Sequence, residues 1–136
     1  MDEPVVANEA DVEVERWADA ARGPVVWRTL FSGDRTPTSA LTVGVAELPP
    51  GVDEADPAHR HEPPEVYFIL DGEGVVEIDG VRTPVRTNSA VFIPGLAAHR
   101  LLNTGSTTLR LLYAFAVDSF ADVTYLFPGE PGEPAT

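Results

Sequence analysis

Short apolar runs separated by turn residues dominate the chain from residue 25 onward. Such runs, rich in β-branched and aromatic side chains and bounded by Gly, Pro, Asn or Asp, indicate β-strands. The runs expected to be strands are Val25–Phe31, Ala40–Leu48, Glu65–Leu70, Val75–Ile78, Val81–Arg86, Ala90–Ile93, His99–Asn103 and Thr108–Val117, with a shorter one at Val123–Phe127. Between two of them, Asp79-Gly80 predicts a type I′ hairpin. Many short strands at regular spacing predict an all-β sandwich or barrel.

Alternation of side chains assigns the residues of each run to opposite faces. Glu65 and Tyr67 share one face of their strand, and the apolar side chains of Val66, Phe68 and Leu70 form the other. In the neighbouring runs, shared faces are expected for Leu41, Val43 and Val45, and for Leu109, Leu111, Tyr113 and Phe115.

The two ends of the chain differ from its middle. We expect residues 1–24 to be an acidic N-terminal tail with a short helix over Val14–Ala21, stopped by Gly23-Pro24. Residues 25–127 are expected to form one domain, as a length of 136 residues suggests. The Pro- and Gly-rich residues 128–136 are expected to be a disordered tail.

Composition excludes several classes of function. A net charge of −13 argues against binding to nucleic acid or to anionic membrane surfaces. There is no cysteine and all nine basic residues are arginine, which excludes thiolate nucleophiles, sulfur-ligated metals and lysine Schiff bases.

No apolar run approaches the ~20 residues that a membrane span needs, and the start Met1-Asp2-Glu3 lacks the basic region of a signal peptide. We therefore expect a cytoplasmic protein with a small-molecule partner. Trp27 and the apolar strand around it would make a poor free sheet edge, so a homodimer is predicted.

The three histidines of the chain fall in two short stretches. In an extended segment His59 and His61 point the same way. Pro63-Pro64 then break the strand ladder, which allows the chain to turn and aim Glu65 back at the imidazoles. A lone His-x-His is more often a solvated loop, but the presence of Glu65 and of His99 in the second stretch predicts a metal site.

These stretches resemble the two sequence motifs of the cupin superfamily. The first motif, Gly, His-x-His, Glu and Gly, is matched by Gly51, His59, His61, Glu65 and Gly72; the second is matched by Pro94, His99 and Asn103. Three departures occur: a longer spacer after Gly51, Asn88 in place of the opening Gly, and Gly95 displaced by one position with Leu96 in the usual place of the Gly. Asn tolerates the left-handed conformation, so the turn at Asn88 is expected to survive.

The resemblance implies a jelly-roll β-barrel that holds one divalent transition metal inside. Carried over residue by residue, the ligands would be His59, His61, Glu65 and His99. Nitrogen and carboxylate ligands suit Fe, Mn, Ni, Co or Zn and do not choose among them. Four protein ligands would leave about two positions of an octahedral shell open for a substrate.

A finer resemblance points to the small cupins that cleave dimethylsulfoniopropionate. It rests on Trp27, the lead-in Ala46–Gly51, Tyr67 and the ending Asp118–Pro128, which contains Tyr125. In those enzymes a tyrosinate near the metal removes the proton α to the substrate carboxylate, and dimethyl sulfide leaves to give acrylate. Tyr67 matches that base and Tyr125 the second tyrosine. A phenol has an ordinary pKa of about 10, so it serves as a base only beside a cation.

Two other functions remain open. An Fe(II)-dependent cupin dioxygenase would use the same four ligands and need no tyrosine base. A non-catalytic protein that binds a metal or a small ligand would be favoured by a site closed by large apolar side chains, but Phe68 and Phe92 are expected to point away from the metal. Tyr67 and Tyr125 would then be packing residues.

Overall fold

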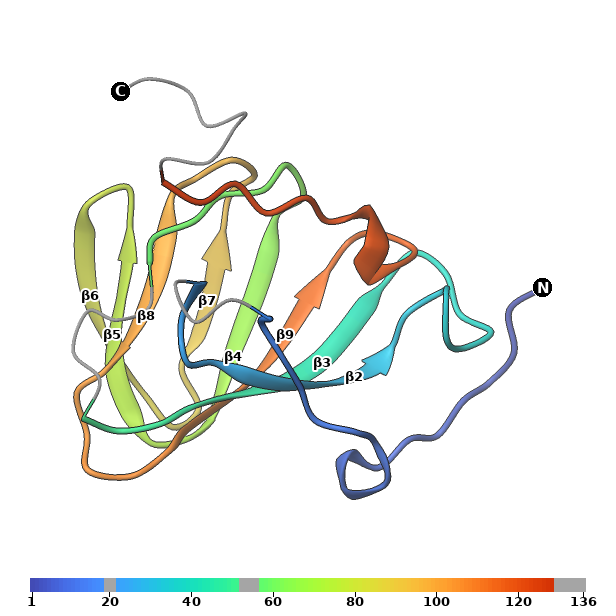
Figure 1. Cartoon of the computed structure of the whole chain (residues 1–136), viewed down its shortest axis with the longest axis horizontal. Helices are drawn as coiled ribbons and strands as arrows, with labels where there is room; N and C mark the ends of the chain where they lie inside the picture. Colours follow the sequence, from blue (N-terminus) through green and yellow to red (C-terminus); the bar gives the residue numbers. More distant parts are fainter. Residues whose placement is uncertain (19–21, 52–56, 129–136) are drawn as a thin grey trace.

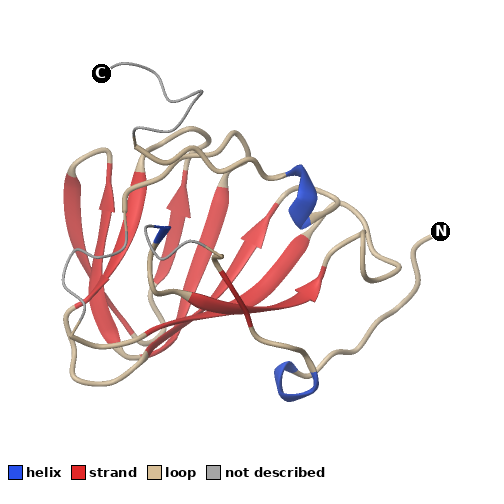
Figure 2. Ribbon diagram, viewed as in Figure 1, coloured by secondary structure: helices blue, strands red, loops and turns tan. Residues whose placement is uncertain are grey.

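The computed structural model describes residues 1–18, 22–51 and 57–128, and their regular structure consists of strands and short 3-10 turns. Two antiparallel sheets pack face to face (Figures 1 and 2). The larger has the order β1-β2-β3-β9-β4-β7 and the smaller β6-β5-β8. The strands are β1 (Glu15–Arg16), β2 (Val26–Phe31), β3 (Thr42–Leu48), β4 (Glu65–Asp71), β5 (Glu73–Ile78), β6 (Val81–Arg86), β7 (Ala90–Ile93), β8 (His99–Asn103) and β9 (Leu109–Phe115). The predicted all-β jelly-roll class is confirmed.

Strand β9 lies between β3 and β4 and shows the predicted alternation. Its four inward side chains are buried: Leu109, Leu111, Tyr113 and Phe115. On β4, Glu65 and Tyr67 are buried on the inner face, while Val66 and Phe68 are exposed on the outer one. The polar face of β4 thus points into the barrel, which places a carboxylate and a phenol there.

Strand β3 shows the expected shared face of Val43 and Val45, and this face points away from the interior. Its fully inward positions are Thr42, Gly44, Ala46 and Leu48. Leu41 is exposed, whereas Val45 is buried on the outer side of the sheet. The N-terminal segment reaches this part of the sheet, since Glu9 in the 3-10 turn η1 (Glu9–Asp11) forms an ion pair with Arg110 of β9.

The helix predicted over Val14–Ala21 is wrong for the residues that the structure describes; Asp19–Ala21 lie outside them. Glu15–Arg16 instead forms β1, which pairs antiparallel with β2. An extended segment can form hydrogen bonds with the backbone N–H and C=O groups at the edge of β2, whereas a helix there could not. The edge around Trp27 is therefore covered by the chain itself, which removes the reason given for a homodimer; the oligomeric state and the domain boundaries stay predictions.

Other turns follow the sequence. Asp79 and Gly80 have positive φ of 48° and 83°, as a type I′ turn requires. Asn88 adopts φ 75°, and Leu96 adopts φ 64° in the position where the family motif has Gly. The strand expected over Val123–Phe127 is reduced to a single bridge at Leu126. In the described residues, no helix is long and apolar enough to cross a membrane.

Candidate metal centre and substrate cavity

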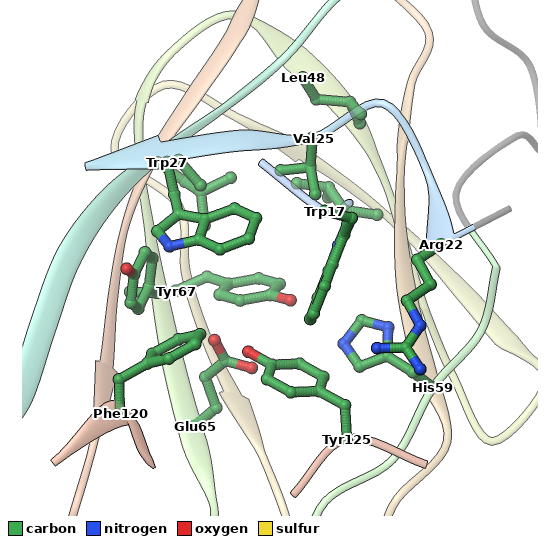
Figure 3. Close-up of a pocket in the computed structure, with 14 residues that line it drawn as sticks. Trp17, Arg22, Val25, Trp27, Leu48, His59, Glu65, Tyr67, Phe120 and Tyr125 are labelled. Atoms are coloured by element: carbon green, nitrogen blue, oxygen red, sulfur yellow. The ribbon is translucent and has the colours of Figure 1, made fainter. Parts of the chain in front are cut away.

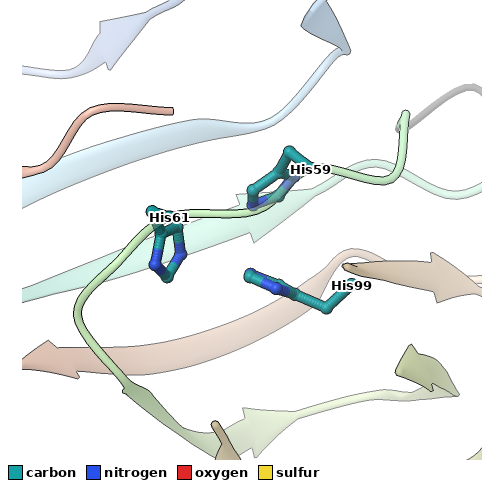
Figure 4. Close-up of side chains that lie close together, drawn as sticks. All are labelled: His59, His61 and His99. Atoms are coloured by element: carbon teal, nitrogen blue, oxygen red, sulfur yellow. The ribbon is translucent and has the colours of Figure 1, made fainter. Parts of the chain in front are cut away.

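The three histidines come together because the segment of His59 lies between two other pieces of chain. His59 and His99 exchange backbone hydrogen bonds of 2.9 and 2.8 Å, and Arg60 pairs in the same way with Leu126 on the other side. Successive side chains of an extended segment point to opposite faces, so His59 and His61 point to the same side. Both face the interior point that His99 also faces (Figure 4). The sequence-predicted trio is thus brought together.

A tight turn then returns Glu65 to the histidines. The His61 carbonyl accepts a hydrogen bond from the Leu96 amide at 2.8 Å. A side chain at Gly95 would collide with the carbonyl oxygen of Glu62, so this close approach needs glycine. As β4 begins, Glu65 Oε1 lies 3.2 Å from His61 Nε2 and 3.4 Å from His99 Nε2.

Backbone carbonyls fix which imidazole nitrogen faces the interior. Nδ1 of His61 lies 2.8 Å from the Pro63 carbonyl oxygen, and Nδ1 of His99 lies 2.8 Å from the Ala97 carbonyl oxygen. Because a carbonyl oxygen only accepts, each Nδ1 must be the donor. In the neutral rings Nε2 is then an acceptor and faces the Glu65 carboxylate, which also only accepts.

That arrangement fits a cation. Without one, lone pairs of two imidazoles and a carboxylate would face one another in a buried space, since His61, His99 and Glu65 are 1%, 1% and 4% exposed. Burial and the neighbouring His99 hold the pKa of His59 well below its usual value, which favours the neutral form that binds metal. The ligand atoms of the three histidines lie within 4.8 Å of one another, so this group can hold a metal ion.

A cavity of about 80 Å³ adjoins the cluster. His59, Glu65, Tyr67 and Tyr125 all line it (Figure 3). On the same scale a single water molecule needs ~10–15 Å³, so the cavity has room for a small molecule only. The Tyr125 ring centroid is 5.2 Å from those of both His59 and His61, whereas that of Tyr67 is 6.4 Å from His99.

Much of the remaining wall is aromatic, and sequence reasoning missed its role. Trp17, Trp27, Tyr113 and Phe120 line the cavity, together with Arg22. Phe68 and Phe92 point outward as expected, so the site is closed by other rings than those considered from the sequence. A tryptophan inside an otherwise polar N-terminal segment was the available signal that this segment packs on the barrel.

Tyr113 is a third tyrosine in the cavity, on the inward face of β9. Burial raises its pKa well above the usual value, so its phenol stays protonated. It lies directly over Gly44 of β3, where any side chain would strike its ring. The Tyr113 phenol is therefore not poised to act as a base.

Comparison with known proteins agrees with this architecture. Residues 44–115 match the cupin domain family, and the chain belongs to that family. It is 39% identical over 124 residues to the dimethylsulfoniopropionate lyase DddW of Ruegeria pomeroyi, covering 91% of this chain and 80% of that protein. The resemblance to lyase-like cupins noted in the sequence is thus confirmed.

Two further relatives concern oxalate. The chain is 30% identical over 111 residues to an oxalate-binding protein of Thermotoga maritima, covering 79% of this chain and 90% of that one. The crystal structure of a predicted oxalate decarboxylase from the same organism superposes with a TM-score of 0.70 at 28% identity, covering 83% of this chain and 99% of the other.

Proposed function

We propose that this cupin is a metal-dependent lyase that cleaves dimethylsulfoniopropionate or a close analogue by β-elimination. The observation that carries the proposal is that one small cavity joins His59 and Glu65 to two tyrosines, Tyr67 and Tyr125. The 39% identity to a dimethylsulfoniopropionate lyase supports it.

The proposed ligands are His59, His61, Glu65 and His99. A divalent ion held by them, whether Fe, Mn, Ni, Co or Zn, would act as a Lewis acid on a coordinated carboxylate and so acidify the adjacent C–H. The Nδ1–carbonyl hydrogen bonds of His61 and His99 hold both rings in the orientation and tautomer that this role needs.

Tyr67, as the phenolate, takes the proton from the α carbon. The C–H electron pair becomes the Cα–Cβ π bond, the Cβ–S bond breaks, and its electron pair leaves with neutral dimethyl sulfide; acrylate remains. No oxidant or water is consumed. Tyr125, whose ring centroid lies 5.2 Å from those of His59 and His61, would contact the substrate beside Tyr67.

The cavity wall suits a zwitterion of this kind. Arg22 supplies a cation near His59 that complements a carboxylate, and the rings of Trp17 and Trp27 supply the faces to which an onium group is attracted. The largely aromatic wall would also limit access of water to the carbanion-like transition state.

The test is turnover of purified protein reconstituted with each of the five metals in turn, with metal-stripped protein as the control. Dimethyl sulfide and acrylate should form in equal amounts, at the same rate in air and under anaerobic conditions. Turnover that needs oxygen would replace the lyase with an Fe(II) dioxygenase.

A second candidate is a protein that binds a small carboxylate without transforming it. The identity to an oxalate-binding protein favours it. Calorimetry with oxalate and with dimethylsulfoniopropionate separates the two: tight binding of oxalate, with no product from either compound under any metal, would establish the binding function.

A further inference from the structure

One wall of the cavity comes from the N-terminal segment. Trp17 follows β1 directly, and its ring centroid lies 5.1 Å from that of Trp27 and 5.1 Å from that of Tyr125. It also meets the Phe127 ring edge-on at 5.4 Å. Trp17 thus joins strand β2 to the segment after β9, and it lies outside residues 44–115 that match the family.

The two faces of the Trp17 ring have different surroundings. The Arg22 guanidinium carbon lies 5.6 Å from the Trp17 ring centroid and 5.1 Å from that of Phe127, so one cation already stacks there. Figure 3 shows Arg22 and Trp27 on opposite sides of Trp17. On the Trp27 side, Phe120 stacks on Trp27 at 6.0 Å and extends the aromatic surface along the cavity.

A polar clamp fixes the strand that carries Trp17. Both oxygens of Glu15 accept hydrogen bonds from Arg35, Nη1 and Nη2 each at 2.8 Å, and Oε2 also accepts from Thr29 Oγ1 at 2.7 Å. A bidentate pair of this kind restricts orientation as well as distance. Since Glu15 is two residues before Trp17, the clamp restricts the backbone that carries the indole.

We propose that Trp17 selects the onium end of the substrate, and that Glu15 and Arg35 are positioning residues for it. The inference deepens the proposed function, on which it rests, by assigning substrate charge selectivity to one side chain. The metal cluster and Tyr67 would act on the carboxylate end, and Trp17, packed against Trp27, would bind the cationic end.

The test compares two unreactive carboxylates of equal shape on the metal-loaded protein: trimethylammonioacetate and its neutral carbon isostere, 3,3-dimethylbutanoate. Calorimetry should show that the wild type prefers the cation by about tenfold. Trp17→Leu should bring the preference to about one, and Trp17→Phe should retain part of it, because a smaller π face is kept. Bound metal should be unchanged in both variants.

Arg35→Gln should also lower the preference for trimethylammonioacetate over its neutral isostere. Arg82→Gln is its matched control, since Arg82 pairs with Glu77 at 3.6 Å on the other sheet. If Arg35→Gln melts at a lower temperature but keeps the preference, the clamp has a purely structural role. That result would overturn the assignment of Glu15 and Arg35 as positioning residues.

A wild-type preference that survives in Trp17→Leu, or a wild type that binds both carboxylates equally or neither, overturns the inference. A wild type that shows the preference but releases no dimethyl sulfide overturns the lyase instead and leaves the onium subsite standing.

Discussion

The cavity has two walls that the chain builds in different ways. One carries His59, Glu65 and Tyr67, and all three come from within residues 44–115. The other carries Trp17 and Phe120, which come from the two ends of the chain. The first wall presents polar side chains, and the second consists of packed aromatic rings. Under the proposed function, this division would assign the metal chemistry to the barrel and substrate selection to the chain ends.

Removing a ligand should have the largest effect. His61→Ala is expected to lose most of the bound metal and nearly all activity, because it removes one of the proposed buried ligands. Arg60→Ala, the neighbour in the same extended segment, is the control and should keep its metal. Metal analysis of both purified proteins checks this, and a full complement in His61→Ala would show that the ligand assignment is wrong.

Tyr67→Phe comes next, since it keeps the ring and removes the oxygen that is proposed to take the proton. Loss of a general base typically costs ~10²–10⁴ in rate. Metal content and melting temperature should change little. Tyr125→Phe, which changes the second tyrosine in the same way, should lose less of the turnover rate. Near-normal, oxygen-dependent turnover of Tyr67→Phe would rule out the elimination and favour a dioxygenase, which loses only one hydrogen bond.

The packing of the barrel beside the cavity can be tested through Gly44. A Cβ there would lie 2.7 Å from the Arg28 carbonyl oxygen and closer still to the Tyr113 phenol. Gly44→Ala should therefore destabilise the protein by about 1–3 kcal/mol, as overpacking does. Gly105→Ala is the control, because its nearest neighbour is the flexible Glu73 side chain at 3.1 Å. An unchanged urea midpoint for Gly44→Ala would show that Tyr113 has room to move.

The same contrast explains what the sequence revealed. The histidine wall was readable because its residues are close along the chain and strand alternation decides which way Glu65 and Tyr67 point. The aromatic wall was not, because Trp17 and Tyr125 meet only through tertiary packing. Propensity suggested a helix around Trp17, whereas the free edge of β2 and the burial of the indole favoured a strand. Local patterns cannot contain such long-range pairings.

The smallest effect concerns the clamp and its pH dependence. The hydrogen bonds from Arg35, followed by that from Thr29, hold the pKa of the Glu15 carboxyl below its ordinary value of 4.5, against the opposing effect of burial. A carboxyl whose pKa is lower in the folded state stabilises the fold above its unfolded pKa, and this stabilisation is lost as the pH falls through the folded pKa. Asp34, whose oxygen lies 3.9 Å from Arg35 Nε, is the other carboxylate near the pair.

Arg35→Gln should therefore reduce the free energy of unfolding by about 1 kcal/mol at pH 7, a modest value because the pair is partly exposed to solvent. The difference from wild type should shrink as the pH falls below 4.5 and through the lowered pKa of Glu15 in the folded protein, because protonation removes the charge that pairs with Arg35. Urea denaturation at pH 7 and at a series of lower pH values measures it. A difference that does not change with pH would mean that Arg35 stabilises β1 by packing rather than by its charge.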